Sequence, residues 1–277
     1  MERNNHISAI YAEKPSFYAS VLDISPYPSY TGRKGICRKE GFIMERTKER
    51  SRWAGRLEVV LVMAAIWLFG FSTSFIRFGY WTGQILRFCL FAVLPCVVLL
   101  PHPFAYMGFT RKRIGKQLLL GLLTALILYP VCMAISLLIR QPVVPEGYRI
   151  SFSLRLLNQS GSLIASQAVS ILILSVPEEL LFRGYFQNRL VFFTSSRYAR
   201  WMIQAVLFGL FHIVNHLDNP LSPDTLVQVT IATVYGLIVG WLYMNREKTG
   251  YTILSAMTSH VLYNGMVQFL LFDAVPA

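Results

Sequence analysis

The sequence predicts an all-α fold: a polytopic membrane helical bundle with about seven transmembrane helices, with an eighth left open. Only 14% of the 277 residues are charged and 54% are hydrophobic, whereas soluble domains carry nearer 25% charged residues. Apolar runs of roughly 20 residues, enough to cross a bilayer, recur along the chain. They lie at 57–75, 85–100, 117–139, 162–182, 201–215, 226–244 and 253–272. The composition therefore excludes a soluble enzyme.

The net charge of +12 would by itself suggest nucleic acid or anionic lipid as a partner. The positive-inside rule explains it better, because Lys and Arg concentrate in alternate loops. These basic residues are Arg46, Lys48, Arg50, Arg52, Arg56, Arg111, Lys112, Arg113, Lys116, Arg189, Arg197, Arg200, Arg246 and Lys248. The loop with Asp218 and Asp224 carries neither Lys nor Arg, whereas the three Arg of 140–155 fit less well. We expect an integral, multi-pass protein of the cell (inner) membrane with a cytoplasmic N-terminus, in contact with the lipid bilayer and with no nucleic-acid partner.

Two segments differ in composition. Residues 1–55 mix Tyr, Ser, Pro and charged residues without helical periodicity and lack the apolar core of a signal peptide. They are predicted to form a basic, disordered cytoplasmic tail, and residues 56–277 a single helical membrane domain. Met44 opens a short basic leader, so we hypothesise that it is the natural start, which N-terminal sequencing of the native protein tests.

The cysteines, at positions 37, 89, 96 and 132, lack CxxC spacing and are interpreted as packing residues.

The first polar cluster interrupts the fourth apolar run. Glu179 and Arg183 are four residues apart on one helix face, which predicts a structural ion pair, whereas Glu178 points about 100° away. Glu178 thus has no partner within its helix, and a carboxyl group in apolar surroundings is a candidate general base. Pro177 removes a backbone hydrogen bond, so the carbonyl of Ile173 could form a polar, water-accepting notch beside the carboxylates.

Two further polar clusters follow in later runs. Phe208 and His212 share a helix face, and Gly209 allows a neighbouring helix to approach closely. His260 and Asn264 again stand four apart, and their donors could stabilise a developing oxyanion. Each cluster lies roughly ten residues into its helix, about 15 Å from the membrane surface. We expect Glu178, His212, His260 and Asn264 to face a common cavity at this depth.

The three motifs, Glu-Glu-x-x-x-Arg at 178–183, Phe-x-x-x-His at 208–212 and His-x-x-x-Asn at 260–264, resemble those of the CPBP family of intramembrane proteases. That family includes the type II CAAX prenyl endopeptidases and the bacteriocin-immunity (Abi) proteins. The resemblance covers about 162–272 and implies that 56–277 is a protease-like domain. It implies that Glu178 activates the attacking water with help from His212, and that His260 and Asn264 stabilise the oxyanion. The residues implied to hold or pack beside the site are Glu179, Arg183 and Phe208.

The family is often labelled metalloprotease-like, but this sequence has no His-Glu-x-x-His motif. A glutamate-activated water requires no cofactor, although zinc held by Glu178, His212 and His260 would account for the same residues. His212 and His216 could also share a metal ion. We favour His216 as an interfacial residue because it lies close to the loop at Asn219 and Pro220.

The sequence therefore predicts an intramembrane endopeptidase whose substrate is a peptide or membrane protein, with a lipidated one suggested by the resemblance. Two other functions stay open. One is a non-catalytic membrane binding or bacteriocin-immunity protein with the same fold. The other is an ion or proton-coupled transporter, which buried carboxylates would also suit but for which no inverted repeat is evident.

Overall fold

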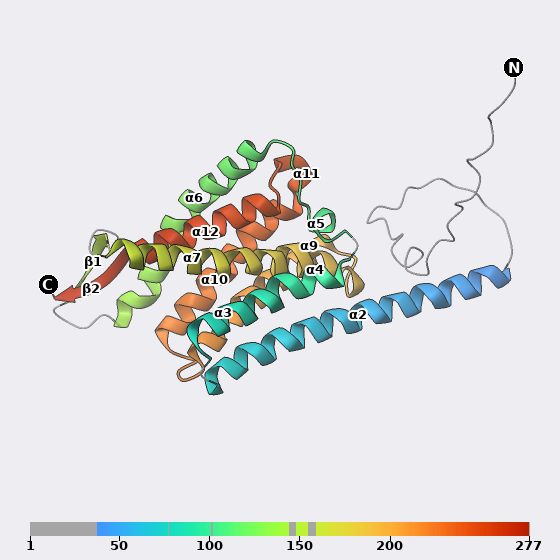
Figure 1. Cartoon of the computed structure of the whole chain (residues 1–277), viewed down its shortest axis with the longest axis horizontal. Helices are drawn as coiled ribbons and strands as arrows, with labels where there is room; N and C mark the ends of the chain where they lie inside the picture. Colours follow the sequence, from blue (N-terminus) through green and yellow to red (C-terminus); the bar gives the residue numbers. More distant parts are fainter. Residues whose placement is uncertain (1–37, 77, 101, 144–147, 155–158, 277) are drawn as a thin grey trace, which may run out of the picture. The chain divides into compact units, whose positions relative to one another are not determined.

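The computed structural model describes residues 38–76, 78–100, 102–143, 148–154 and 159–276 (Figure 1). Contacts divide the chain into two units, Met1–Ala54 and Gly55–Ala277. Residues 1–37 of the predicted tail, Cys37 included, lie outside the described residues. The second unit contains all three polar motifs and is described below.

Helices dominate the second unit, and several continue through short 3₁₀ or π-helical turns. The first half contains α2 (Arg38–Phe75, which begins in the first unit), α3 (Tyr80–Phe88), η1 (Cys89–Val93), α4 (Leu94–Val98), α5 (Pro103–Tyr106), α6 (Ile114–Arg140) and η2 (Gln141–Val143). The second half contains α7 (Gly161–Glu179), η4 (Leu180–Phe186), α8 (Gln187–Arg189), η5 (Leu190–Phe192), α9 (Arg197–Phe211), η6 (His212–His216), α10 (Pro223–Met244), α11 (Arg246–Thr249) and α12 (Ile253–Phe269).

The helical membrane bundle is confirmed, whereas the number of crossings is not. Among the described residues, five stretches are long and apolar enough to span a membrane, namely Ser51–Thr73, Tyr80–Val98, Ile114–Arg140, Gly161–Phe192 and Pro223–Met244. They match the first four predicted runs and the sixth. The other two predicted runs correspond to α9, with 15 residues, and α12, with 17. At 1.5 Å per residue these helices are about 22 and 25 Å long, less than the roughly 30 Å of a bilayer core.

Serine and threonine caps define where the helices of the site begin. The side chains of Ser160, Ser196 and Ser222 accept hydrogen bonds from backbone N–H groups in the first turns of α7, α9 and α10. Thr252 starts α12 with a capping box completed by Ser255. Such caps satisfy backbone donors that have no partner inside the helix. They fix the starting points of the four helices that carry the three motifs or pack against them.

The helices around α7 bring the motifs together. In Figure 1, α7 runs between α3 and α12, and contacts with both are present. Helix α10 packs against α9 and α6, and α12 packs against α6. Gly209 is needed for the α9–α10 contact, because a Cβ atom there would collide with Thr233 Oγ1 of α10. The predicted close helix approach at Gly209 is therefore confirmed.

Two features were not predicted. A two-stranded antiparallel ribbon pairs β1 (Tyr148–Leu154) with β2 (Leu270–Pro276), with Leu154 opposite Leu270. The predicted seventh run extended to residue 272, but α12 ends at Phe269 because the apolar residues that follow form β2. Short apolar runs do not distinguish a strand from a helix end. The second feature is the π-helical turn η4, which directly follows Glu179 where a regular helix was expected.

Candidate active site

Basic and acidic side chains alternate in a series of five residues from three helical segments in the middle of the unit. The order in space is Arg183, Glu179, His260, Glu178 and Arg87. Helix α7 and its π turn supply the first, second and fourth, α12 supplies the imidazole, and α3 supplies the last. His260 therefore lies between two carboxylates, and each carboxylate has an arginine on its other side.

The contacts of Glu179 within this series are short, and they are buried inside the protein. Oε1 of Glu179 accepts hydrogen bonds from Arg183 Nη1 at 3.0 Å and from His260 Nδ1 at 2.8 Å. Neither the Glu179 nor the Arg183 side chain is exposed at all. The predicted Glu179–Arg183 ion pair is thus present, and the same oxygen also orients the His260 ring. Burial, and after it the charge of Glu179, raises the pKa of the Tyr251 phenol just before α12, so this phenol stays neutral beside the site.

Glu178 is surrounded differently. Its Oε2 lies 3.8 Å from His260 Nε2, and its Oε1 lies 4.0 Å from Nη2 of Arg87 on α3. Both separations are longer than a direct hydrogen bond. Glu178 has no partner within its helix, as predicted, but its expected apolar surroundings are wrong because Arg87 and His260 flank it. Only 8% of the side chain is exposed.

Aromatic rings enclose the buried arginine. The Arg183 guanidinium carbon lies 4.3 Å from the centroid of the Phe208 ring and 5.4 Å from that of Tyr235. Stacking on ring faces compensates in part for the Nε and Nη2 atoms of Arg183, which make no hydrogen bond to the described residues. The Phe208 ring also packs edge-on against His260, with centroids 5.9 Å apart. Phe208 therefore packs beside the site, as the sequence predicted.

His212 and Asn264 each use one polar group in a hydrogen bond within the protein and keep a second one for a ligand. Nδ1 of His212 donates to the Phe208 carbonyl oxygen at 2.8 Å, so its Nε2 is the nitrogen with a lone pair. Nδ2 of Asn264 donates to Ser175 Oγ on α7 at 3.0 Å. An amide NH₂ group carries two hydrogens, so one remains for a ligand.

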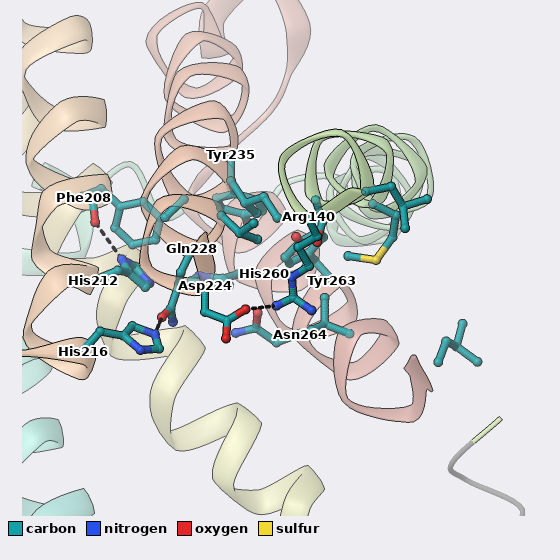
Figure 2. A pocket seen from close by; sticks show the side chains of 18 residues that line it. Arg140, Phe208, His212, His216, Asp224, Gln228, Tyr235, His260, Tyr263 and Asn264 are labelled. Atoms are coloured by element: carbon teal, nitrogen blue, oxygen red, sulfur yellow. Dashed lines mark hydrogen bonds and ion pairs between the residues drawn. The ribbon is translucent and has the colours of Figure 1, made fainter. Parts of the chain in front are cut away.

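A cavity of about 540 Å³ brings the second and third motifs to a common surface. Figure 2 shows His212, His260 and Asn264 on its wall, together with the ion pair between Arg140 and Asp224, whose closest atoms are 2.9 Å apart. Apolar side chains complete the lining, including Met133, Leu137, Val227, Ile231, Val267 and Leu270. The expected common cavity is therefore present for these three residues, while Glu178 lies behind His260 and is not part of its described wall.

The candidate metal ligands do not converge. Within the ranges that the structure describes, no three His, Cys, Asp or Glu side chains are grouped so that they could hold a metal ion. His216 does not share a helical face with His212, because residues 212–216 form a 3₁₀ turn rather than an α-helix. His216 instead contacts Gln228 of α10 on the wall of the same cavity.

Three residues of the site were missed by the sequence analysis. Arg87 had a signal, because it is an ionisable residue inside the predicted run 85–100, and such residues mark functional sites. Ser175 had a weaker one, since it stands four residues before Glu179 on the same helix. The ring centroid of Tyr235 is 4.9 Å from that of His260. No signal in the sequence separates Tyr235 from other aromatic residues in apolar runs.

A helical membrane unit with a buried carboxylate, two histidines and an amide around a cavity has the groups of a hydrolase. Residues 160–266 match the family model described as type II CAAX prenyl endopeptidase, Rce1-like. The stretch from α7 to α12 is therefore similar to the CAAX protease family, which confirms the resemblance that the three motifs predicted. Searches among curated proteins and among solved structures gave no match.

Proposed function

We propose that the protein is a CAAX-protease-like intramembrane endopeptidase. It hydrolyses a peptide bond in a membrane-associated or lipidated peptide or protein, with water activated by Glu178 and His212. The observation that carries the proposal is the spacing around Glu178, whose two carboxylate oxygens lie 4.0 Å from Arg87 and 3.8 Å from His260. Neither separation is a direct hydrogen bond, so both carboxylate oxygens keep lone pairs for a water molecule, which is the nucleophile that hydrolysis needs.

In this mechanism Glu178 accepts a proton from the water as the water oxygen adds to the substrate carbonyl carbon. The proton then passes to the leaving amide nitrogen as the carbon–nitrogen bond breaks, which yields a free carboxylate and a free amine. His212 assists, because its Nε2 lone pair is free while Nδ1 donates to the Phe208 carbonyl. A positioned base of this kind contributes about 10²- to 10⁴-fold in rate.

His260 and Asn264 stabilise the oxyanion that forms on the substrate carbonyl. Glu179 accepts the Nδ1 hydrogen of His260 and so orients the ring, and a hydrogen on Nε2 of that ring would be the donor to the oxyanion. Asn264 offers the amide hydrogen that Ser175 does not take. Fixed donors in surroundings that exclude bulk water are effective because they do not have to reorganise during the reaction. Glu179 and Arg183 act on this step as positioning residues.

The 540 Å³ cavity is the proposed substrate site. Its lining is mostly apolar, with polar groups at His212, His260 and Asn264, and this combination suits an extended peptide with aliphatic side chains. No cofactor is required by the mechanism.

The proposal is tested by comparing peptide termini in host cells that express wild-type protein or the Glu178→Gln variant at matched levels. We expect termini that are present with wild type and lost with Glu178→Gln, while Glu247→Gln on α11, outside the site, behaves as wild type. A purified protein in lipid nanodiscs should then cut the corresponding quenched peptide about 10²- to 10⁴-fold faster than Glu178→Gln. Equal cleavage by both proteins would reject Glu178 as the base. Unchanged termini and no cleavage by either protein would reject the endopeptidase and favour a binding or immunity role.

A further inference from the structure

A second cavity lies beside Arg87, the arginine that is 4.0 Å from Glu178. It measures about 500 Å³ and lies among α2, α3 and the end of α9, with Arg87 and Gln84 on its wall. Oε1 of Glu178 faces Arg87 of this cavity, whereas Oε2 faces His260 of the substrate cavity. Glu178 itself lines neither cavity, but one of its two neighbours lines each of them.

The wall of the second cavity requires polar partners. Gln84 Oε1 and Arg87 Nε are buried, and neither makes a hydrogen bond to any other part of the chain that the structure describes. Thr73 and Asn215 add further polar groups to the same wall. Buried polar atoms are nearly always hydrogen-bonded, and a polar cavity far larger than one water molecule is filled by water.

The second cavity also reaches the aqueous end of the helices. Gly79 and Tyr80, at the turn between α2 and α3, line it together with Arg87. Arg87 is seven residues into α3, so the cavity extends about 10 Å from the helix end. A neighbouring cavity of about 540 Å³ shares Thr73 and Asn215 and extends to Asp218 in the loop before α10.

We propose that this second cavity supplies the hydrolytic water to Glu178, with Arg87 as the positioning residue at its inner end. The inference rests on the proposed endopeptidase function. The two reactants arrive by different routes: the peptide occupies the apolar cavity beside His260, and water reaches the Glu178 carboxylate past Thr73, Gln84 and Arg87. Hydrolysis then continues while the peptide fills the substrate cavity.

Thiol labelling tests the water route without any substrate. In a protein whose four native cysteines are replaced by alanine, Gln84→Cys is compared with Ile85→Cys, its neighbour at the same depth. Ile85 is 62% exposed on the surface of the protein and is not part of the cavity wall, so in a membrane it contacts lipid. A small charged methanethiosulfonate reagent should label Gln84→Cys at least about tenfold faster in lipid nanodiscs. Equal labelling rates would overturn the proposal.

A plug tests whether the route serves the reaction. A Cβ atom at Gly83, on the cavity wall, meets only Phe78 Cβ at 3.8 Å, so Gly83→Leu should fill the cavity without a backbone collision. We expect slower labelling of Gln84→Cys and a several-fold lower kcat with unchanged KM, measured on a farnesylated quenched CAAX peptide or on a peptide identified by the termini comparison. The control is Gly115→Leu, since a Cβ at Gly115 meets nothing within 4 Å.

The outcomes separate this inference from the proposed function. If Gln84→Cys is labelled but Gly83→Leu leaves kcat unchanged, the route is not used by the reaction and the endopeptidase still stands. If wild type cuts no peptide, the endopeptidase falls, and with it the role of the cavity in hydrolysis, whatever the labelling result. Two results together support both the endopeptidase and the water route. Gln84→Cys is labelled fast, and kcat falls in Gly83→Leu but not in the control Gly115→Leu.

Discussion

Glu178 and Glu179 are adjacent in sequence but lie in two different charge groups. The inner group, Glu179 with Arg183 and His260, has direct contacts of 3.0 and 2.8 Å and buried side chains. The outer group, Glu178 with Arg87, is 4.0 Å apart, and 23% of the Arg87 side chain is exposed. The difference indicates that the inner group holds the ring of His260 in place, while the Glu178 carboxylate of the outer group makes no direct hydrogen bond to Arg87.

The largest effect on stability is expected from breaking the inner group. Arg183→Leu leaves Glu179 as a buried carboxylate whose remaining partner is His260. Removing one partner of a buried ion pair costs about 3–5 kcal/mol, so the free energy of unfolding in a bilayer or mild detergent should fall by this amount. Arg183→Lys keeps the charge but lacks the planar guanidinium that stacks on Phe208, so it should lie in between. A loss below about 1 kcal/mol in Arg183→Leu would show that the two groups do not differ in this way.

A smaller effect on stability but a clear effect on turnover is expected in the outer group. Arg87→Leu removes a charge that is partly exposed and not directly hydrogen-bonded to Glu178, so stability should change by about 1 kcal/mol or less. Turnover should fall about tenfold, which corresponds to 1.4 kcal/mol in the barrier, because the carboxylate and its water lose their orienting cation. KM should stay constant, since Arg87 is not part of the substrate cavity wall.

Arg87→Lys distinguishes this role from simple packing. The lysine restores a positive charge at the same place, so it should recover most of the lost kcat. If Arg87→Lys is as slow as Arg87→Leu while both variants melt like wild type, the charge of the outer group does not orient the water.

The smallest effect is expected at the Arg140–Asp224 pair on the rim of the substrate cavity. Its side chains are 44% and 66% exposed, and exposed pairs contribute about 0–1 kcal/mol. Arg140→Gln should therefore change the free energy of unfolding by less than about 1 kcal/mol, and the change should shrink further at high salt. A loss comparable to that of Arg183→Leu would mean that burial does not explain the difference between ion pairs in this protein.

The sequence was sufficient for the parts of the site that depend on helical spacing. Glu179–Arg183 and the pairing of His260 with Asn264 on one helix follow from i,i+4 geometry. The convergence of His212, His260 and Asn264 followed from their similar depth. Arg87 was missed because its role depends on α3 packing beside α7, a tertiary contact that no spacing within one helix encodes. The β1–β2 ribbon was missed for a related reason, since its strands are more than 100 residues apart in sequence.

The π-helical turns have a consequence for how the length of the chain can vary. Such turns commonly arise where a helix contains one residue more than regular α geometry needs. One directly follows Glu179 and the other starts two residues after Arg87. Deleting one residue from Leu180–Phe186 could leave a continuous helix, but it would rotate everything beyond by about 100° relative to Glu179. The Gln187 side chain, which donates to the Gly240 carbonyl of α10, would then point elsewhere, so a single deletion would detach the carboxylates from the anchor that sets their orientation.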